Sequence, residues 1–328
     1  MRPLLFLTIC LASVTIHAQE VSNSYSLMFY NVENLFDNRH DSLKNDSEFL
    51  KGGYKNWSTH RMFQKLNGIS KVILASNGWH PPSVIGLCEI ENSFVLNQLI
   101  YHTGLNNAGY RYIHYESPDK RGIDVALLYK KSEFEVLESS PIHTSDTINH
   151  FYTRDALYVK GIVKKADTIH IVVNHWPSKR GGALASEEKR IKVAAHVSAK
   201  LNAVQQLNQS SKIVVMGDLN AEYDAPSIQQ LLKANELSSV LNPKHIKQSK
   251  LAGSHKYQGH WALIDHIFVS KHWNNHTSMS HRLVELPFLL EDDMAYSGVK
   301  PRRTYAGPRY IGGVSDHLPV ILTIETGS

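Results

Sequence analysis

Residues 214–223 read VVMGDLNAEY, an apolar run that passes through Gly217 directly into Asp218 and Asn220. The pattern predicts a buried strand that ends by presenting a carboxylate and an amide on a turn. Buried polar groups need a hydrogen-bond partner or a ligand, so α/β enzymes often place their chemistry at such strand ends. For this short stretch alone, a local turn in which Asp218 and Asn220 bond the backbone is the simpler explanation.

Three further apolar runs end in the same way. They are residues 25–31, with Asn31 at the end and Glu33 beyond it; residues 83–88, followed by Glu89; and residues 168–173, followed by Asn174 and His175. Each has a structural alternative, since Glu89 suits the N-terminal dipole of a helix expected at 93–101 and a lone histidine is more often structural. Because four strands end alike, we favour one shared site.

The remaining pattern predicts a single α/β domain, because 328 residues, 42% of them apolar, can bury a large core and no repeat or linker interrupts them.

Asp265 lies in an apolar strand and needs a cationic partner there. In a helix at 61–76 the Arg and Lys residues are expected to face outward. The other expected strands are 110–115, 123–129, 156–163, 263–270 and 320–324, and the other helices are 186–207 and 226–232.

The N-terminus and the charge balance indicate an exported protein with a mildly basic surface. Residues 1–18 combine Arg2, an apolar run and a final Ala18, as a signal peptide does; a buried N-terminal helix is the alternative. Without this segment Cys88 is the one remaining cysteine, so an intrachain disulfide is excluded. No later segment predicts a transmembrane helix. A net charge of +5 suits a phosphate-bearing substrate but is too small to indicate nucleic acid.

Six motifs in a fixed order give the chain a family resemblance: FYNVEN, LCEIEN, VNHWPS, GDLNA, IDHIF and SDHLPV. Residues 22–327 resemble a catalytic domain of the endonuclease/exonuclease/phosphatase superfamily, which includes deoxyribonuclease I, abasic-site endonucleases, neutral sphingomyelinases and inositol polyphosphate 5-phosphatases. The resemblance implies an α/β (α+β) fold, a four-layered sandwich. Two mostly antiparallel sheets pack face to face and helices flank them.

The resemblance also implies a divalent-metal site. Glu89 is its principal ligand, Asn31 lies beside it, and Asp316 and Glu33 are further candidates. Oxygen ligands with few carboxylates suit Mg²⁺, with Mn²⁺ or Ca²⁺ as alternatives.

The resemblance assigns the remaining chemistry residue by residue. Asp218 and Asn220 orient or deprotonate the attacking water, and His317, held by Asp265, is either the general base or a stabiliser of transition-state charge. His175 is the general acid, paired with Glu116. Arg154 binds the scissile phosphate together with Asn31 and Asn220.

We therefore expect a monomeric, exported, metal-dependent phosphodiester hydrolase, and we favour nucleic acid as its substrate. The alternative on the same scaffold is a lipid or inositol-phosphate phosphodiesterase, which an exposed aromatic hairpin would favour. Trp57, Trp79, Trp261 and Trp273 are candidates for such a surface. A binding protein without activity is disfavoured, because every metal and acid/base position is filled.

Overall fold

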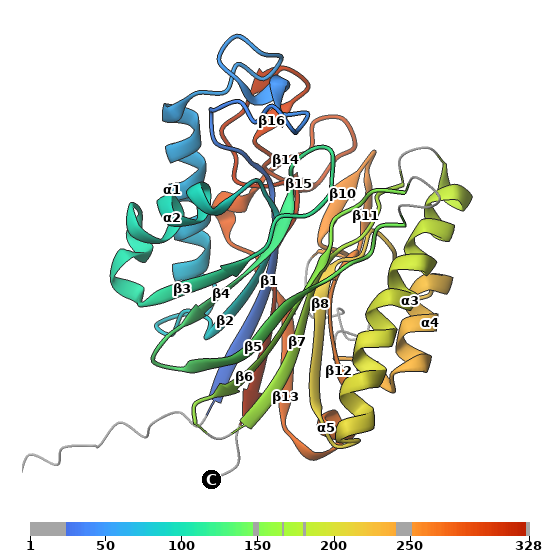
Figure 1. Ribbon diagram of the computed structural model, residues 1–328. Helices are drawn as coiled ribbons and strands as arrows, with labels where there is room; N and C mark the ends of the chain where they lie inside the picture. The colour runs from blue at the N-terminus through green and yellow to red at the C-terminus, as the bar shows by residue number, and fades with distance from the viewer. Residues whose placement is uncertain (1–23, 147–150, 166, 180–181, 241–250, 326–328) are drawn as a thin grey trace, which may run out of the picture.

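The protein, studied as a computed structural model, is described for residues 24–146, 151–165, 167–179, 182–240 and 251–325. The predicted signal peptide at 1–18 lies outside this range. Two six-stranded sheets form the centre of the molecule, and helices cover both outer faces (Figure 1). The predicted four-layered sandwich is thus confirmed. Among the described residues, no helix combines the length and the apolar character needed to cross a membrane.

The first sheet has the strand order β13-β18-β1-β2-β4-β3. Its strands are β13 (Met279–Leu283), β18 (Val320–Glu325), β1 (Ser24–Leu35), β2 (Val84–Ile90), β4 (Asp124–Lys130) and β3 (Tyr110–His114). Helices α1 (Thr59–Ala75) and α2 (Ser93–Tyr101) cover its outer face, on the left in Figure 1.

The second sheet has the order β5-β6-β7-β8-β12-β9. Its strands are β5 (Phe134–Ile142), β6 (Ala156–Val163), β7 (Asp167–His175), β8 (Lys212–Asp218), β12 (Asp265–Ser270) and β9 (Leu237–Ser239). Helices α3 (Ala183–Leu207) and α4 (Pro226–Ala234) cover its outer face. Short elements complete the chain: α5 (Lys271–His276) and the hairpins β10–β11 (His255–Tyr257, His260–Ala262), β14–β15 (Leu290–Asp292, Val299–Pro301) and β16–β17 (Tyr305–Ala306, Arg309–Tyr310).

The central strands read as continuous apolar runs because both of their faces are buried. In β1, Leu27 and Phe29 enter the core between the sheets, while Met28 and Tyr30 enter the core under α1 and α2. Strand β8 alternates in the same way between the inner core and the core under α3 and α4. The four layers therefore follow from side chains that alternate along each strand.

Candidate active site

Strand register brings the predicted strand ends to one edge of the sandwich. Strands β1 and β2 run parallel with Asn31 opposite Cys88, so Asn31 and Glu89 lie at neighbouring strand ends. Strands β7 and β8 also run parallel, with His175 opposite Asp218. Since the two sheets pack face to face, both pairs of ends reach the same site.

The last two motifs reach this edge from antiparallel strands. Asp265 begins β12 directly opposite Asp218, the last residue of β8. Val320 of β18 lies opposite Phe29 of β1, so the segment that precedes β18, including His317, is next to the end of β1. The C-terminal ends of β1, β2, β7 and β8 therefore lie at the same edge as the N-terminal ends of β12 and β18.

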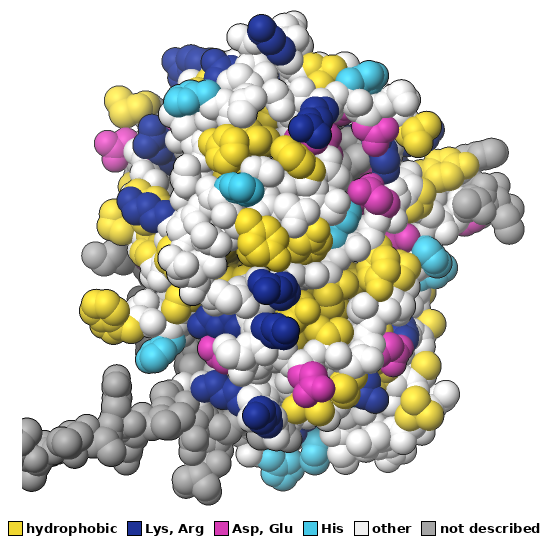
Figure 2. Space-filling view, turned by 60° about the vertical axis from the view of Figure 1, so that its left-hand side comes forward, with side chains coloured by type: hydrophobic (Ala, Val, Ile, Leu, Met, Phe, Trp, Pro, Cys, Tyr) yellow, Lys and Arg dark blue, Asp and Glu magenta, His cyan; other side chains and the backbone are white. Residues whose placement is uncertain are grey.

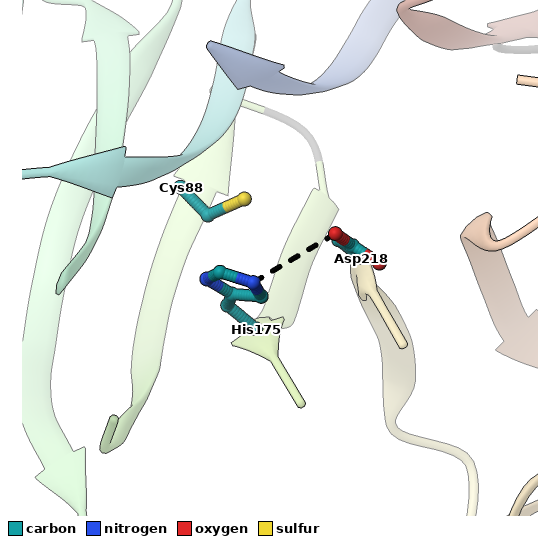
Figure 3. A group of neighbouring side chains, drawn as sticks. All are labelled: Cys88, His175 and Asp218. Atoms are coloured by element: carbon teal, nitrogen blue, oxygen red, sulfur yellow. Dashed lines mark ion pairs between the residues drawn. The ribbon is translucent and has the colours of Figure 1, made fainter. Parts of the chain in front are cut away.

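Asp218 is the most highly connected carboxylate of the site, and its side chain is buried. Asn31 donates from Nδ2 to Oδ2 at 3.0 Å, and the backbone N–H of Asn220 donates to Oδ1 at 3.0 Å. The Nε2 atoms of His175 and His317 lie 3.7 Å and 3.8 Å from the same Oδ2. Figure 3 shows the side chains of His175, Asp218 and Cys88 grouped together. Cys88 is a buried thiol that sequence reasoning did not assign to the site.

Glu89 is half-buried and lies at a break in the regular pairing of β2. Its Oε2 accepts the backbone N–H of Asn34 at 2.7 Å, and its Oε1 lies 3.9 Å from His175 Nε2. Glu89, Asn34 and Asn220 have positive φ angles of 62°, 53° and 49°, as does Glu33 at 51°. Such angles cost about 1–3 kcal/mol each for residues other than glycine and cluster at functional sites. The strand ends are therefore held in an unfavourable backbone conformation where the polar groups meet.

His317 has the cationic role that the buried Asp265 requires. Its Nδ1 is 2.8 Å from Asp265 Oδ2, which also accepts Ser254 Oγ at 2.5 Å. Burial alone would lower the pKa of His317, but the charges of Asp265 and Asp218 outweigh it and raise the pKa well above 6.5. His317 is therefore protonated at neutral pH, and its Nε2–H faces Asp218. The sequence pattern did not reveal Ser254, because it lies in an irregular segment.

His175 differs from His317 in its protonation state. Burial and the nearby charges of Arg154 and Arg121 lower the pKa of His175 well below 6.5, so its imidazole is neutral. Burial raises the pKa of Asp218 to about 7, with His317 opposing this shift and Asp265 adding to it. Neighbouring groups with pKa values moved in opposite directions are typical of acid–base sites.

Two further acidic groups, Glu33 and Asp316, share the surroundings of Glu89, because the charges of all three raise the pKa of Arg303. Burial and the charge of Asp316 raise the pKa of Glu33 to about 7. Arg303 partly balances this charge, since its Nη2 donates to Asp316 Oδ2 at 2.6 Å and its Nε lies 3.7 Å from Glu33 Oε1. Burial acts to raise the pKa of Asp316, but the charges of His317 and Arg303 outweigh it and lower that pKa, so Asp316 is ionised and offers a carboxylate oxygen together with the partly exposed Glu89. The donor set therefore fits a divalent cation with oxygen ligands.

Arg154 and Glu116 lie at the border of the site. Arg154 donates from Nη2 to the carbonyl of Trp176 at 3.0 Å and from Nη1 to Asp119 Oδ2 at 3.3 Å, so the guanidinium is anchored beside the His175 strand end. Glu116 is exposed, and one of its carboxylate oxygens lies within 4.8 Å of side-chain atoms of His114 and Asp124. Glu116 makes no hydrogen bond or ion pair with His175 in the described part of the chain.

Two cationic side chains have positions that the sequence pattern did not predict. The expectation that the Lys residues of the first helix face outward is wrong for Lys65, which is buried and donates to Thr304 Oγ1 at 2.6 Å and Val314 O at 2.8 Å. Arg121, to which no role was assigned, donates to Asn34 Oδ1 at 2.7 Å and so supports the loop that holds Glu89.

A cavity of about 540 Å³ opens beside Arg154. Its lining is mainly cationic and aromatic, and includes Lys120, Arg121, Phe151, Tyr152, Arg154 and Lys189. Cations and aromatic rings together suit a ligand that carries both phosphate and planar groups. Figure 2 shows one face of the molecule, on which Lys and Arg side chains are scattered among acidic and uncharged ones.

Comparisons with solved structures show the same architecture in proteins of low sequence identity. An endonuclease/exonuclease/phosphatase family protein from Bacteroides thetaiotaomicron is 16% identical, with a TM-score of 0.60 over 92% of this chain and 94% of that one. The human Nocturnin catalytic domain with bound sulfate is 18% identical, with a TM-score of 0.58 over 93% and 95%. A Bacteroides thetaiotaomicron mannosyl-6-phosphatase is 15% identical, with a TM-score of 0.59 over 92% and 99%. No curated protein sequence matches the chain.

The solved structures are too distant in sequence to show more than a shared fold. A family model shows to which family the chain belongs. The model described as "Endonuclease/Exonuclease/phosphatase family" matches residues 26–326, nearly the whole length of the chain. The match includes all six motifs, and the motifs converge on the edge where Glu89, His175, Asp218 and His317 meet. The chain therefore belongs to the endonuclease/exonuclease/phosphatase family.

Proposed function

We propose that the chain is an exported, divalent-metal-dependent phosphodiester hydrolase that acts on nucleic acid. The observation that carries the proposal is the meeting of a half-buried carboxylate, one neutral and one protonated histidine and a buried aspartate, linked by distances of 3.7–3.9 Å. These are Glu89, His175, His317 and Asp218. Export rests on the signal-like sequence of residues 1–18.

Glu89 and Asn31 would hold the cation, with Asp316 and Glu33 on the same side of the site. When bound, a divalent cation coordinates a phosphate oxygen and neutralises part of its charge. Asp316 and Glu33 would serve as further ligands of the cation or would orient the water molecules bound to it.

Asp218 accepts a proton from the attacking water as the water oxygen bonds to phosphorus. Its pKa of about 7 suits a base that works at neutral pH. Asn31 and Asn220 donate to its two oxygens and so fix the direction in which the carboxylate points. The water is thereby directed at one face of the phosphate.

The two histidines serve the phosphate and the leaving group. His317, protonated and held by Asp265, directs Nε2–H toward the oxygens that gain charge in the transition state. His175, as a neutral imidazole, donates a hydrogen bond from Nε2–H to the leaving oxygen as the P–O bond breaks. A neutral imidazole does not give up this proton, so the leaving oxygen takes its proton from water, and the general-acid role that the resemblance implies would need a protonated His175. Arg154 contacts a phosphate from the neighbouring cavity.

The cavity favours nucleic acid over a lipid substrate. Its aromatic and cationic lining suits bases and phosphates. Trp57 and Trp273 are buried and Trp261 is half-buried, so none of them forms an exposed aromatic surface. Trp79 is exposed but precedes β2, on the side of the strand's first residue, whereas Glu89 lies near its last. An inositol-phosphate substrate is the alternative that the experiment must distinguish from nucleic acid.

The experiment incubates the protein without its signal segment with plasmid DNA, RNA, sphingomyelin or inositol phosphates, each with Mg²⁺ or with a chelator. Cleavage of DNA or RNA only, lost with the chelator, is the expected result. Asp218→Ala should abolish cleavage with little change in melting temperature, and Asp224→Ala, an exposed neighbour with the same charge change, should not. Cleavage retained in Asp218→Ala, or hydrolysis confined to inositol phosphates or lipid, would refute the proposal.

A further inference from the structure

A second group of metal-ligating side chains lies where β3 passes into β4. His114 is the last residue of β3 and pairs with Ala126, and Asp124 lies two residues before Ala126 at the start of β4. Side chains two residues apart in a strand share a face, so His114 and Asp124 point to the same side of the sheet. Glu116 follows His114 by two residues and joins them from the loop.

The geometry of the three side chains is that of a small coordination site. His114 Nε2 lies 3.4 Å from Asp124 Oδ2, and the ligand atoms of all three residues lie within 4.8 Å of one another. The side chains of His114 and Asp124 are only 4% and 1% exposed, whereas Glu116 is exposed. An ion could therefore enter from the Glu116 side and rest on the two buried groups.

The two buried atoms that face each other have no hydrogen bond. Asp124 Oδ1 accepts from the backbone N–H and the hydroxyl of Ser117, whereas Oδ2 and His114 Nε2 lie within ion-pair distance of each other and have no hydrogen-bond partner among the described residues. Buried polar atoms are normally satisfied, and those that are not call for a missing partner such as an ion. Lys44, whose charge acts on Glu116, donates instead to the carbonyls of Ser117 and Asp119.

The donor types identify the class of ion. We propose that His114, Glu116 and Asp124 bind a divalent transition-metal ion of the Zn²⁺ class, separate from the cation at Glu89. Two ligands at about 2.0–2.1 Å from a tetrahedral Zn²⁺ lie about 3.3–3.4 Å apart, which matches the separation of His114 Nε2 and Asp124 Oδ2. An imidazole ligand suits Zn²⁺ and disfavours Mg²⁺, which prefers oxygen.

The loop that this ion would fix borders the active site. Residues 115–123 carry Asp119, which pairs with Arg154, and Arg121, which donates to Asn34. Asn34 in turn donates its backbone N–H to Glu89. An ion bound at the base of the loop would therefore hold these contacts in place, and the three ligands act as positioning residues.

The test measures metal binding directly and needs no substrate. Chelator-treated protein in excess Mg²⁺, which occupies oxygen sites, is titrated with Co²⁺ and followed by visible absorption; Zn²⁺ is then counted by equilibrium dialysis. We expect one ion per chain, an affinity at least about tenfold lower in Glu116→Gln and His114→Gln, and no change in Glu135→Gln, a matched exposed variant. Circular dichroism checks that each variant is folded.

Three results would overturn the proposal. The first is the absence of stoichiometric binding in the wild-type chain, and the second is unchanged affinity in both ligand variants. The third is a near-ultraviolet thiolate-to-Co²⁺ band that Cys88→Ser removes, because it would place the ion beside His175 and Asp218 instead. Glu89→Gln should bind Co²⁺ and Zn²⁺ as tightly as the wild type does. The metal-binding result therefore does not depend on whether the chain hydrolyses phosphodiesters.

Discussion

The carboxyl group of Glu91 makes the stability of the protein depend on pH in a way that one substitution can isolate. Glu91 follows β2, is 6% exposed, and accepts the backbone N–H of Asp37 at 2.6 Å. Burial raises its pKa from 4.5 to about 8. The hydrogen bond from the Asp37 N–H opposes this rise, and the charges of Asp37, Asp46 and Asp41 add to it. The folded protein therefore holds this proton more tightly than the unfolded chain does.

The sign and the size of the effect follow from this difference. The contribution of Glu91 to stability is fully present below pH 4.5 and is lost as the pH rises through about 8. A pKa that rises from 4.5 to about 8 on folding corresponds to about 4–5 kcal/mol at pH 9. With about 2.1 cal/mol/K of unfolding entropy per residue, a domain of about 300 residues shifts its melting temperature by about 7 °C for this energy.

Glu91→Gln removes the charge and keeps an oxygen that accepts from Asp37. In the presence of a chelator we expect equal melting temperatures for variant and wild type near pH 4.5, and a variant more stable by several degrees at pH 9. Calorimetry at both pH values measures the difference, and Glu135→Gln controls for the loss of a surface charge. Equal melting temperatures at pH 9 would refute the pKa assigned to Glu91.

Three further substitutions test the site and its support. Asp265→Asn removes the charge that keeps His317 protonated and should lower kcat about 10²- to 10⁴-fold with unchanged circular dichroism; a fall of less than about threefold would contradict the role of the pair. Ser254→Ala removes one hydrogen bond to Asp265 and should cost about tenfold in kcat, and a loss equal to that of Asp265→Asn would show that Ser254 does more than position it. Gly217→Ala would place a Cβ 2.5 Å from the carbonyl oxygen of Asn174 and should lower the free energy of unfolding by about 1–3 kcal/mol in urea titrations; unchanged stability would mean that the strands are not so closely packed.

The features predicted well from the sequence are those that depend on local pattern. Apolar runs predicted β1, β2, β7 and β8, because both faces of these central strands are buried. The polar residue that ends each run then marked the edge where Glu89, His175 and Asp218 meet. The need of Asp265 for a cationic partner was also visible from its apolar neighbours, and His317 meets it.

Other features depend on contacts between distant segments and left no local signal. Strand β5 is an edge strand with several exposed positions, so its pattern did not distinguish it from a loop. Lys65 lies on a helix of regular spacing, yet it is buried because Thr304, 239 residues away, folds over it. The placement of Glu116 beside His114 and Asp124 likewise depends on how β3 pairs with β4.

The central claim is that Glu89 holds a divalent cation on which phosphodiester cleavage depends. The most direct test is Mn²⁺ binding by electron paramagnetic resonance, with hydrolysis of the substrate found in the panel measured on the same samples, for the wild type and Glu89→Gln. The account predicts that Glu89→Gln loses both tight Mn²⁺ binding at the active site and hydrolysis, while its circular dichroism is unchanged. Wild-type Mn²⁺ affinity together with wild-type turnover in Glu89→Gln would contradict it.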